Sequence, residues 1–294
     1  MPVPICLFTY NRLGELQRTV DALKRNCLAA KSELFIFSDG AKSAEVEHKV
    51  AEVRKYLKTI SGFKSVSIEE SPINRGLASS IIAGVSRIVQ QYGKVIVLED
   101  DLITTPNFLN FLNQALDYYQ DHPKIMSISG YSMDLPSLKD YEPDFYLGYR
   151  AASWGWGIWK DRWELVDWDM KSYRSFKWDF LRQVQFMRGG MDMPYMLWKQ
   201  MNGRLDSWAI RLGYCQFEKD LLTVFPSKSK LKSIGFGSEA THTRSSQRFA
   251  CKLDEELKTE FIFDPQPCLE PVLAKEFREK FSLKTRLSEK FKFV

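Results

Sequence analysis

The first third of the chain alternates short apolar segments with amphipathic ones, and this rhythm limits the fold more than any other feature of the sequence. The apolar segments have the length of buried strands, and the segments between them carry apolar residues at helical spacing. Strands that alternate with helices in this way form a mostly parallel central sheet flanked by helices. The sequence therefore predicts an α/β fold. The expected strands are 3–9, 33–38, 64–69 and 94–98, and the expected helices are about 13–29, 43–61 and 77–92.

The second part of the chain has a less regular organisation. A helix is expected from Thr105, as N-cap, to about Asp121, because Pro106 then occupies the first helical position, where proline is favoured. No internal repeat or low-complexity linker divides the chain, so we treat 1–250 as one domain and 251–294 as a tail. The other expected elements are strands 125–130, 145–150 and 221–225 and helices near 175–187, 191–201 and 207–217.

Three consecutive acids, Glu99, Asp100 and Asp101, follow the buried strand 94–98. The carboxyl ends of parallel strands lie at one edge of a sheet, where open α/β sheets bind their ligands. Adjacent carboxylates repel one another unless a metal, a hydroxyl-rich ligand or basic side chains neutralise them, and carboxylate oxygens favour Mg²⁺ or Mn²⁺. The triplet therefore indicates a ligand site at this edge, and a solvated acidic turn is the alternative.

Composition and missing motifs exclude several classes of function. Lysine and arginine exceed aspartate and glutamate by 42 to 37, an excess too small and too scattered to predict a nucleic-acid partner. The five cysteines form no Cys-x-x-Cys pair, so we expect reduced, buried thiols in a cytoplasmic protein, with Cys6 in a strand and Cys27 on a helix. The pattern of a signal peptide is missing, and no segment has the ~20 apolar residues of a membrane span. P-loop and GxGxxG patterns are also missing, which argues against kinase-like NTPases and NAD-dependent enzymes.

Several motifs, taken in order over about residues 3–243, resemble glycosyltransferases of the GT-A fold, the nucleotide-diphospho-sugar transferases. Leu98-Glu-Asp-Asp-Leu102 resembles the Glu-Asp-Asp version of the DxD motif in eukaryotic N-acetylglucosaminyltransferase I. Other motifs resemble bacterial family 2 glycosyltransferases that build surface polysaccharides such as O-antigen, capsule or lipopolysaccharide. The resemblance implies that 1–101 binds the nucleotide sugar and 102–250 the acceptor. These other motifs are Thr9-Tyr-Asn-Arg12, Asn74-Arg-Gly-Leu-Ala78, Trp154-Gly-Trp-Gly157, Asp206-Ser-Trp-Ala-Ile-Arg211 and Ile234-Gly-Phe-Gly…Ala240-Thr-His-Thr243.

The resemblance also implies how the acidic triplet acts. Asp101 is expected to reach a Mn²⁺ or Mg²⁺ ion on the diphosphate of a UDP-sugar donor, while Glu99 and Asp100 face hydroxyls of the donor sugar or ribose. His242 is a possible second metal ligand by analogy with related folds. The alternative for His242 is a structural or exposed side chain, which is the usual state of a single histidine.

Residues at the other strand ends are implied to bind the rest of the donor. Thr9, Asn11 and Arg12 would hold the nucleoside together with Asp39, whose carboxylate would accept a hydrogen bond from the uracil N3–H. Asn74 and Arg75 precede the helix that begins near Leu77, where a cation and helix amides can bind diphosphate. The alternatives are structural: Asp39-Gly40 would be a turn pair, Asn74 an N-cap and Arg12 a surface side chain.

Transfer of a sugar also requires a base that takes a proton from the attacking hydroxyl. By resemblance we expect Asp206 to be that base, and Asp192, after two glycines, is the reserve candidate. A base opposite the leaving group implies a single in-line displacement, and hence inversion at the anomeric carbon. The alternative for Asp206 is an N-cap of the helix 207–217.

Trp154, Gly155 and Trp156 are expected to contact the acceptor, with the indoles stacking on a sugar and the glycine allowing close approach. The alternative is a corner of the hydrophobic core. Lys228, Lys230 and Lys232 precede a glycine-containing loop and would either clamp diphosphate when the loop closes or remain solvated.

The end of the chain, 271–294, carries seven basic and three acidic residues among apolar ones, as basic amphipathic helices do. We expect it to contact the anionic inner face of the cytoplasmic membrane, where a lipid-linked oligosaccharide or other glycan acceptor would lie. A helix packed against its own domain or a partner is the alternative.

Two rival functions share part of these features. A sugar-1-phosphate nucleotidyltransferase would share the sheet, metal and nucleotide, but it requires a glycine-rich loop directly after the first strand, and this chain has Thr9-Tyr-Asn-Arg-Leu-Gly-Glu there. A non-catalytic carbohydrate-binding protein would use the tryptophans but has no need of a metal-ready acidic triplet.

Overall fold

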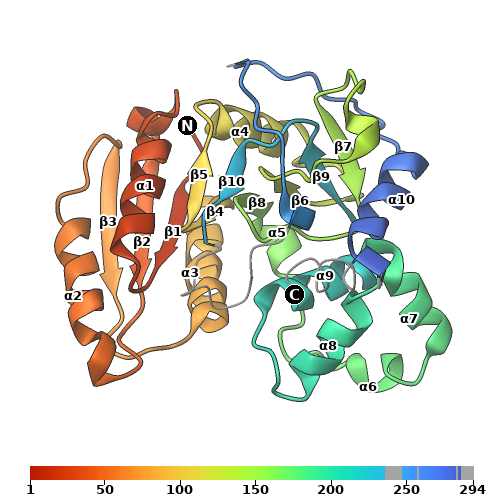
Figure 1. The fold of residues 1–294 in the computed structure, drawn as a ribbon, viewed down its shortest axis with the longest axis horizontal. Helices are drawn as coiled ribbons and strands as arrows, with labels where there is room; N and C mark the ends of the chain where they lie inside the picture. Colours follow the sequence, from red (N-terminus) through yellow and green to blue (C-terminus); the bar gives the residue numbers. More distant parts are fainter. Residues whose placement is uncertain (236–246, 257, 283, 286–294) are drawn as a thin grey trace.

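The computed structural model describes residues 1–235, 247–256, 258–282 and 284–285, and its centre is a mixed sheet of eight strands (Figure 1). Four parallel strands form one half of the sheet, and two of the other four run antiparallel to them. Strands β5, Leu102–Thr104, and β10, Leu231–Ser233, pair separately. The order across the sheet is β3 (Ser65–Glu70), β2 (Glu33–Ser38), β1 (Ile5–Thr9), β4 (Lys94–Glu99), β8 (Trp156–Trp159), β6 (Ile125–Ser129), β9 (Leu222–Pro226) and β7 (Phe145–Gly148).

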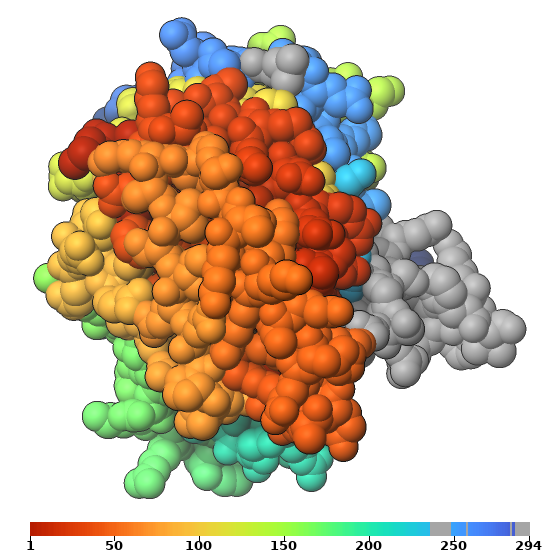
Figure 2. Space-filling view, turned by 90° about the vertical axis from the view of Figure 1, so that its left-hand side faces the viewer, coloured from red at the N-terminus to blue at the C-terminus, as the bar shows by residue number. Residues whose placement is uncertain are grey.

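Helices flank the sheet, which confirms the predicted α/β fold with a mostly parallel sheet. The end of the molecule that carries β3 and α2 is formed by the first third of the chain, and Figure 2 looks onto it. The α-helices are α1 (Leu13–Lys24), α2 (Ala44–Leu57), α3 (Leu77–Tyr92), α4 (Phe108–Tyr118), α5 (Lys160–Trp163), α6 (Tyr173–Phe176), α7 (Phe180–Phe186), α8 (Met193–Met201), α9 (Trp208–Glu218) and α10 (Pro271–Lys280). The 3₁₀-helices are η1 (Ala29–Lys31), η2 (Pro136–Leu138), η3 (Met187–Gly189) and η4 (Gln247–Phe249).

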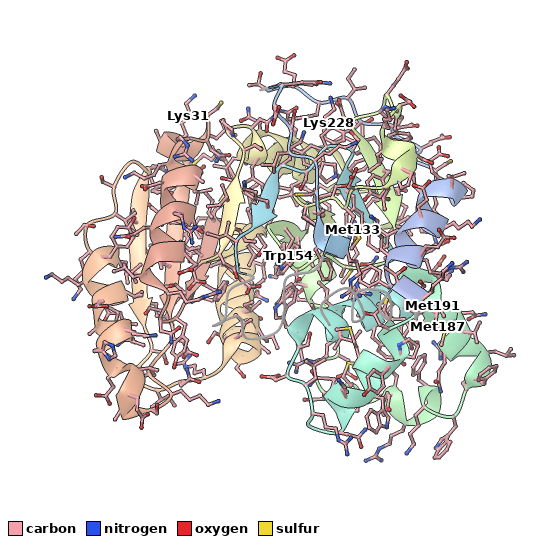
Figure 3. All side chains as sticks on the ribbon, in the orientation of Figure 1. Lys31, Met133, Trp154, Met187, Met191 and Lys228 are labelled. Carbon is pink, nitrogen blue, oxygen red and sulfur yellow. The ribbon has the colours of Figure 1, made fainter. Side chains whose placement is uncertain are left out.

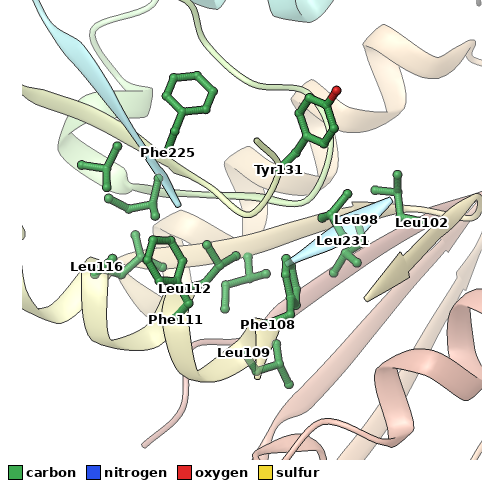
Figure 4. Close-up of a cluster of buried hydrophobic side chains, with 14 of the residues drawn as sticks. Leu98, Leu102, Phe108, Leu109, Phe111, Leu112, Leu116, Tyr131, Phe225 and Leu231 are labelled. Carbon is green, nitrogen blue, oxygen red and sulfur yellow. The ribbon is translucent and has the colours of Figure 1, made fainter. Parts of the chain in front are cut away.

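Alternation along the strands divides the core between the two faces of the sheet. Ile5 and Leu7 of β1 point to the face covered by α1, α2 and α4, whereas Cys6 and Phe8 point to the face covered by α3 and α9. Figure 4 shows part of the first cluster, where leucines and phenylalanines of α4 meet Leu98, Phe225 and Leu231. Since both faces are covered, β1 and β4 are apolar except at their terminal residues, Thr9 of β1 and Lys94 and Glu99 of β4.

Helices α6 to α9 form a small additional unit with its own core. Phe176 and Phe186 contact each other edge to face at 5.6 Å between ring centroids, and both contact Tyr214 of α9. The predicted helix 175–187 is therefore two helices, α6 and α7, interrupted at Asp179, whose carboxylate caps α7 by accepting a hydrogen bond from Arg182 N–H. This unit lies at the end of the molecule opposite β3 (Figure 1).

Several further local predictions are wrong in detail. The helix expected from Thr105 begins at Phe108, with Asn107 at the N-cap position, because the Thr105 hydroxyl instead contacts Asn107 Oδ1 and the carbonyl of Lys230. The five cysteines were all expected to be buried, but Cys27 and Cys268 are exposed. Cys27 lies in a turn after α1, since that helix ends at Lys24 rather than near residue 29.

The C-terminal segment packs onto the domain. Helix α10 buries Leu273 and Phe277, with the Phe277 ring 5.5 Å from that of Phe225 in β9, and the buried Phe281 follows. The apolar side of this helix is therefore not free to enter a membrane, and packing against its own domain, the alternative, is what the structure has. The rest of the predicted tail, Leu283 and 286–294, lies outside the described residues. Among the described residues, no helix is long and apolar enough to cross a bilayer.

Candidate functional site

A cavity of about 810 Å³ opens at the carboxyl ends of β1, β2 and β4. One wall consists of these strand ends and the start of α3, and the opposite wall of α8, α9 and aromatic residues from the C-terminal segment. Trp154 and Met133 lie in the middle, between the two halves of the molecule (Figure 3). The volume is within the range of pockets that hold a nucleotide-sized ligand. The cavity contains most of the predicted site residues: Thr9, Asn11, Arg12, Asp39, Asn74, Glu99, Asp100, Asp101, Trp154, Asp192 and Asp206.

Arg12 is the cation that neutralises part of the acidic triplet. Its Nη2 lies 2.6 Å from Asp100 Oδ1 and 3.0 Å from Asp101 Oδ2. Asp100 also accepts hydrogen bonds from the Thr9 hydroxyl at 2.9 Å and from Tyr10 N–H at 3.2 Å, and it is almost fully buried. Both oxygens of Asp100 are thus occupied by the β1–α1 connection, which makes Asp100 a structural link between the ends of β1 and β4. The solvated-turn alternative is wrong for this residue.

Asp101 and Glu99 face the cavity. One oxygen of Asp101 pairs with Arg12, and the backbone around Gly235 runs against the same oxygen, since an added Cβ at Gly235 would lie 2.0 Å from it. Within the described part of the chain, no hydrogen bond or ion pair involves the Glu99 side chain. Burial, together with the charges of Asp101 and Asp100, raises the pKa of Glu99 to about 8. At neutral pH, Glu99 is therefore mostly protonated, and a cation bound beside it would favour its ionised form.

The composition of this wall fits a divalent cation. Three carboxyl groups face one guanidinium, which leaves two negative charges when all three are ionised. The described residues contain no cluster of three side chains arranged as metal ligands. Mn²⁺ and Mg²⁺ commonly take one or two protein carboxylates and complete their coordination with water and phosphate oxygens, so Asp101 suffices as an anchor. His242, the possible second ligand, lies outside the described residues.

Asp39 organises the loop that precedes α3. Its carboxylate accepts hydrogen bonds from three backbone N–H groups, those of Gly40 at 2.9 Å, Arg75 at 2.8 Å and Gly76 at 2.9 Å. Asn74 donates to the carbonyl of Gly40 at 2.8 Å, so it is not the N-cap of α3. That position belongs to Gly76, which has a φ of 78°. Asp39 thus has the structural role of the turn-pair alternative, and its side chain also borders the cavity.

The side chain of Arg75 does not line the main cavity. It borders a separate hollow of about 180 Å³ behind β2, next to Arg87. The prediction that it meets the ligand directly is therefore not supported in this conformation. Its backbone N–H, by contrast, is held by Asp39.

Asp206 lies where the two halves of the cavity meet. A Cβ added at Gly76, at the start of α3, would be 3.9 Å from Asp206 Oδ2. The side chain is 61% exposed, and Oδ1 lies 3.3 Å from Arg211 Nη2. Ser207, not Asp206, caps α9 by accepting a hydrogen bond from Ile210 N–H. The capping alternative is therefore wrong, and the Asp206 carboxylate remains available to a ligand.

Asp192, the reserve candidate, is engaged by Arg150. The guanidinium contacts both carboxylate oxygens, at 2.8 and 3.3 Å, and its other surface stacks over the Phe281 ring at 4.0 Å. Asp192 is buried, and this bidentate pair connects the start of α8 with the C-terminal segment.

The tryptophan motif divides between the core and the site. Trp156 is 1% exposed and stacks on Trp208 at 4.6 Å and on Trp163 at 5.8 Å, so the prediction that it contacts the acceptor is wrong. Gly155 serves packing, because it has a φ of 53° and an added Cβ would lie 2.1 Å from Leu231. Only Trp154 lines the cavity, in contact with the rings of Tyr131 and Phe249.

Lys230 is not a diphosphate clamp. It is buried in an ion pair with Asp254, which also accepts a hydrogen bond from Asn107 at 2.8 Å. Lys228 pairs with Glu256 at the surface. Both pairs hold the segment after residue 250 to the strand region before β10.

Sequence reasoning missed the C-terminal contribution to the cavity. Phe249, Phe277 and Phe281 line it together with Arg150 and Arg248. The pattern of 271–294 indicated a basic amphipathic segment but not the surface that it covers. Among these residues, only Arg150 could have been suspected from the sequence, because it is a cation at the end of a predicted strand.

Comparison with known proteins assigns most of the chain to a family. The profile described as Glycosyl transferase family 2 matches residues 5–181. No curated protein sequence matches the chain. Similar solved structures include TarS of S. aureus, with 12% identity over 44% of this chain and 21% of that one and a TM-score of 0.29, and its fragment TarS 1-349, with 10% identity over 80% and 61% and a TM-score of 0.42. Another is the mannosyltransferase PcManGT from Pyrobaculum calidifontis in complex with GDP-Man and Mn²⁺, with 12% identity over 55% and 47% and a TM-score of 0.36. The chain spans between about a fifth and three fifths of the length of these proteins.

Proposed function

Because the chain belongs to glycosyl transferase family 2, which agrees with the predicted glycosyltransferase class of enzyme, we propose that it transfers a sugar from a UDP-sugar to a hydroxyl of a glycan, with inversion at the anomeric carbon. The observation that carries this proposal is the cavity at the strand ends, with Asp101 and Glu99 on the donor side and Asp206 where the two halves meet.

Asp101 is the proposed metal anchor, in the Glu-Asp-Asp arrangement that resembles N-acetylglucosaminyltransferase I. A bound Mn²⁺ or Mg²⁺ ion supplies Lewis-acid stabilisation to the departing diphosphate. Arg12 supports this geometry, since its contacts with Asp100 and Asp101 fix the position of the Asp101 carboxylate. Glu99, which faces the cavity, is available to donor hydroxyls.

The nucleoside is proposed to lie between the ends of β1 and β2. Thr9 and Asn11 border the cavity there, as does Asp39, the proposed acceptor for the uracil N3–H. The carboxylate of Asp39 is held by three N–H groups, so its orientation is fixed before a ligand enters. Asn74 and the start of α3 lie beside it, where helix amides favour an anion.

Asp206 is the proposed general base. Its carboxylate would accept the proton of the acceptor hydroxyl, because Oδ2 points toward the donor half of the cavity and Arg211 holds the other oxygen. Asp192 is the weaker candidate, since Arg150 binds both of its oxygens. General-base catalysis contributes roughly 10²–10⁴-fold to a rate, which sets the loss expected when the base is removed.

Trp154 is the proposed acceptor platform, supported by its position in the cavity beside Phe249. The acceptor is proposed to be a glycan or lipid-linked oligosaccharide of a bacterial surface polysaccharide, O-antigen, capsule or lipopolysaccharide, assembled at the inner face of the cytoplasmic membrane. This assignment rests on the motif resemblance.

Donor choice is tested by thermal unfolding with Mn²⁺ and a panel of UDP-, GDP- and dTDP-sugars. A UDP-sugar should raise the melting temperature, and Asp101→Asn should abolish the shift, while Asp140→Asn, an exposed aspartate outside the cavity, should keep it. A larger shift with GDP-sugars would refute the Asp39 assignment, whereas a larger shift with dTDP-sugars, whose thymine has the same N3–H, would refute only the choice of UDP. Full activity in excess chelator would refute the metal proposal.

The reaction itself is tested by following UDP release. Asp206→Asn should keep the donor-induced thermal shift and lower turnover by about 10²–10⁴-fold, and the anomeric configuration of the product should be opposite to that of the donor. Unchanged turnover in this variant would move the role to another residue. Stabilisation by sugars without UDP release would favour the carbohydrate-binding alternative, and pyrophosphate-dependent breakdown of the donor would favour the nucleotidyltransferase.

A further inference from the structure

Helix α7 presents an apolar surface to solvent, although its opposite side is already packed. Trp178, just before the helix, is 82% exposed, and Phe180 and Leu181 are each 73% exposed. Val184, one turn after Phe180, is also exposed. Four large apolar side chains within seven residues differ from the single exposed apolar residues that are common on soluble proteins. We call these four residues the α7 surface.

The α7 surface is held in place by well-formed structure. Phe186, on the inner side of α7, contacts the ring of Phe176 at 5.6 Å and that of Phe217 at 5.0 Å. Asp179 caps the helix. The helix therefore cannot turn over to bury Phe180 and Leu181 without breaking the small core between α6 and α9. Outward orientation of these side chains is fixed by the fold.

The charges around the α7 surface are positive. Between 171 and 188 the chain has five basic residues and one acid, Asp179, which is used as the cap; two of the five, Arg182 and Arg188, pair with Glu218 and Asp220. Lys171, Arg174 and Lys177 are exposed, and within the described residues none of the three makes an ion pair. The Lys177 amine lies 5.1 Å from the centre of the Trp178 ring. Cations thus border the aromatic surface directly.

We propose that the α7 surface docks on an anionic lipid bilayer. Tryptophan, phenylalanine and leucine beside lysine and arginine match the chemistry of the lipid interface, where apolar side chains enter the acyl boundary and cations face lipid phosphates. This places membrane contact on α6 and α7, at the end of the molecule opposite β3 (Figure 1), and not on α10, whose apolar side is buried. Helix α8, which follows α7 and η3, lines the cavity through Met193 and Met196.

The test is sedimentation of the whole chain with vesicles, which does not depend on sugar transfer. Vesicles of phosphatidylcholine with about a third phosphatidylglycerol should bind the protein, and pure phosphatidylcholine should bind it far more weakly. Replacing Lys171, Arg174 and Lys177 by glutamine should weaken binding on the order of 100-fold, since each cation near an anionic surface contributes about fivefold. The triple substitution Trp178→Ser, Phe180→Ser, Leu181→Ser should reduce binding by about tenfold or more.

A matched control uses exposed apolar residues elsewhere. Ile262 and Val272 are 78% and 56% exposed on the C-terminal segment, and Ile262→Ser with Val272→Ser should leave binding unchanged. Brominated lipids should quench part of the tryptophan fluorescence, and Trp178→Phe should remove that part.

Defined results overturn the proposal. Failure of the wild-type chain to sediment with anionic vesicles would do so, as would full binding by the α7-surface triple variant. A dimer that these three substitutions abolish, without vesicle binding, would identify the α7 surface as an interface between copies. The glutamine variant retains all apolar residues, so it keeps the test valid if the serine variant does not fold.

Discussion

Replacing Arg12 by methionine removes the guanidinium that faces the buried carboxylate of Asp100. The pair is short, at 2.6 Å, and the side chains of Arg12 and Asp100 are 18% and 4% exposed. Loss of one partner leaves a buried charge uncompensated, which typically costs about 3–5 kcal/mol of unfolding free energy. Because Arg12 is partly exposed, we expect the lower end, about 3 kcal/mol. In a chain of this size that corresponds to a fall in melting temperature of about 6–12 °C.

Arg18 provides the matched control, one and a half turns further along the same region. It also pairs with an acid, Glu15, at 3.4 Å, but its side chain is 57% exposed. Exposed pairs at this spacing contribute about 0–0.5 kcal/mol, so Arg18→Met should hardly change stability. Arg12→Lys keeps the charge but loses the geometry that lets one guanidinium reach both Asp100 and Asp101, so its loss should be intermediate.

Differential scanning calorimetry in chelator, without nucleotide, measures the free protein. The reasoning is refuted if Arg12→Met and Arg18→Met lower the melting temperature equally, because burial of the Asp100 carboxylate would then not determine the cost. A loss for Arg12→Lys as large as for Arg12→Met would refute the role of the retained charge.

Three further predictions concern stability and the acceptor. Burial would raise the pKa of Asp254, but hydrogen bonds and charge from its partners lower it overall. The stabilisation by the ionised carboxylate is therefore present above the unfolded pKa of about 4 and is lost as pH falls through the folded pKa. The difference in unfolding free energy between wild type and Asp254→Asn, measured with urea, should narrow from pH 7 to pH 3. Trp156→Ala should cost about 3–5 kcal/mol in the same assay, whereas Trp154→Ala should mainly raise the KM for the acceptor; the opposite pattern would contradict the assignment of one indole to the core and the other to the cavity. Gly155→Ala should cost about 1–3 kcal/mol by urea unfolding, because its Cβ would meet Leu231, and an unchanged midpoint would show that the loop can relax.

The local hydrophobic pattern was sufficient to predict the bounds of several helices and strands in the first half of the chain. The helix predicted over 77–92 has those bounds in α3, and the strand 33–38 has those of β2. Gly93, with a φ of 79°, ends α3 in the left-handed conformation that glycine adopts readily. Periodicity and terminal residues specify such elements because the interactions involved span only a few residues.

Positions within the site depended on contacts between distant segments. Thr9 and Asp100 are 91 residues apart, and their hydrogen bond makes Asp100 structural and leaves Asp101 and Glu99 toward the cavity. Three equivalent acids in sequence thus have three different environments. Likewise, the sequence predicted a basic amphipathic segment over 271–294, but the partner of the apolar side of α10 within it is β9, far away in sequence.

The amino-acid order alone determined an α/β sheet with polar residues at its strand ends. Strands and helices can be predicted because the burial of their faces gives a periodic pattern of apolar residues. The carboxyl ends of parallel strands then lie at one edge of the sheet. Through the resemblance of its motifs to known glycosyltransferases, the sequence also pointed to the acids, Asp206 and Trp154 as candidate site residues. Only the tertiary structure decided which side chains are available to a ligand and which are engaged in core packing or ion pairs, as Trp156, Asp192 and Lys230 are. The physical reason is that burial and pairing of a side chain depend on neighbours that are distant in sequence, and these are defined only when the chain has folded.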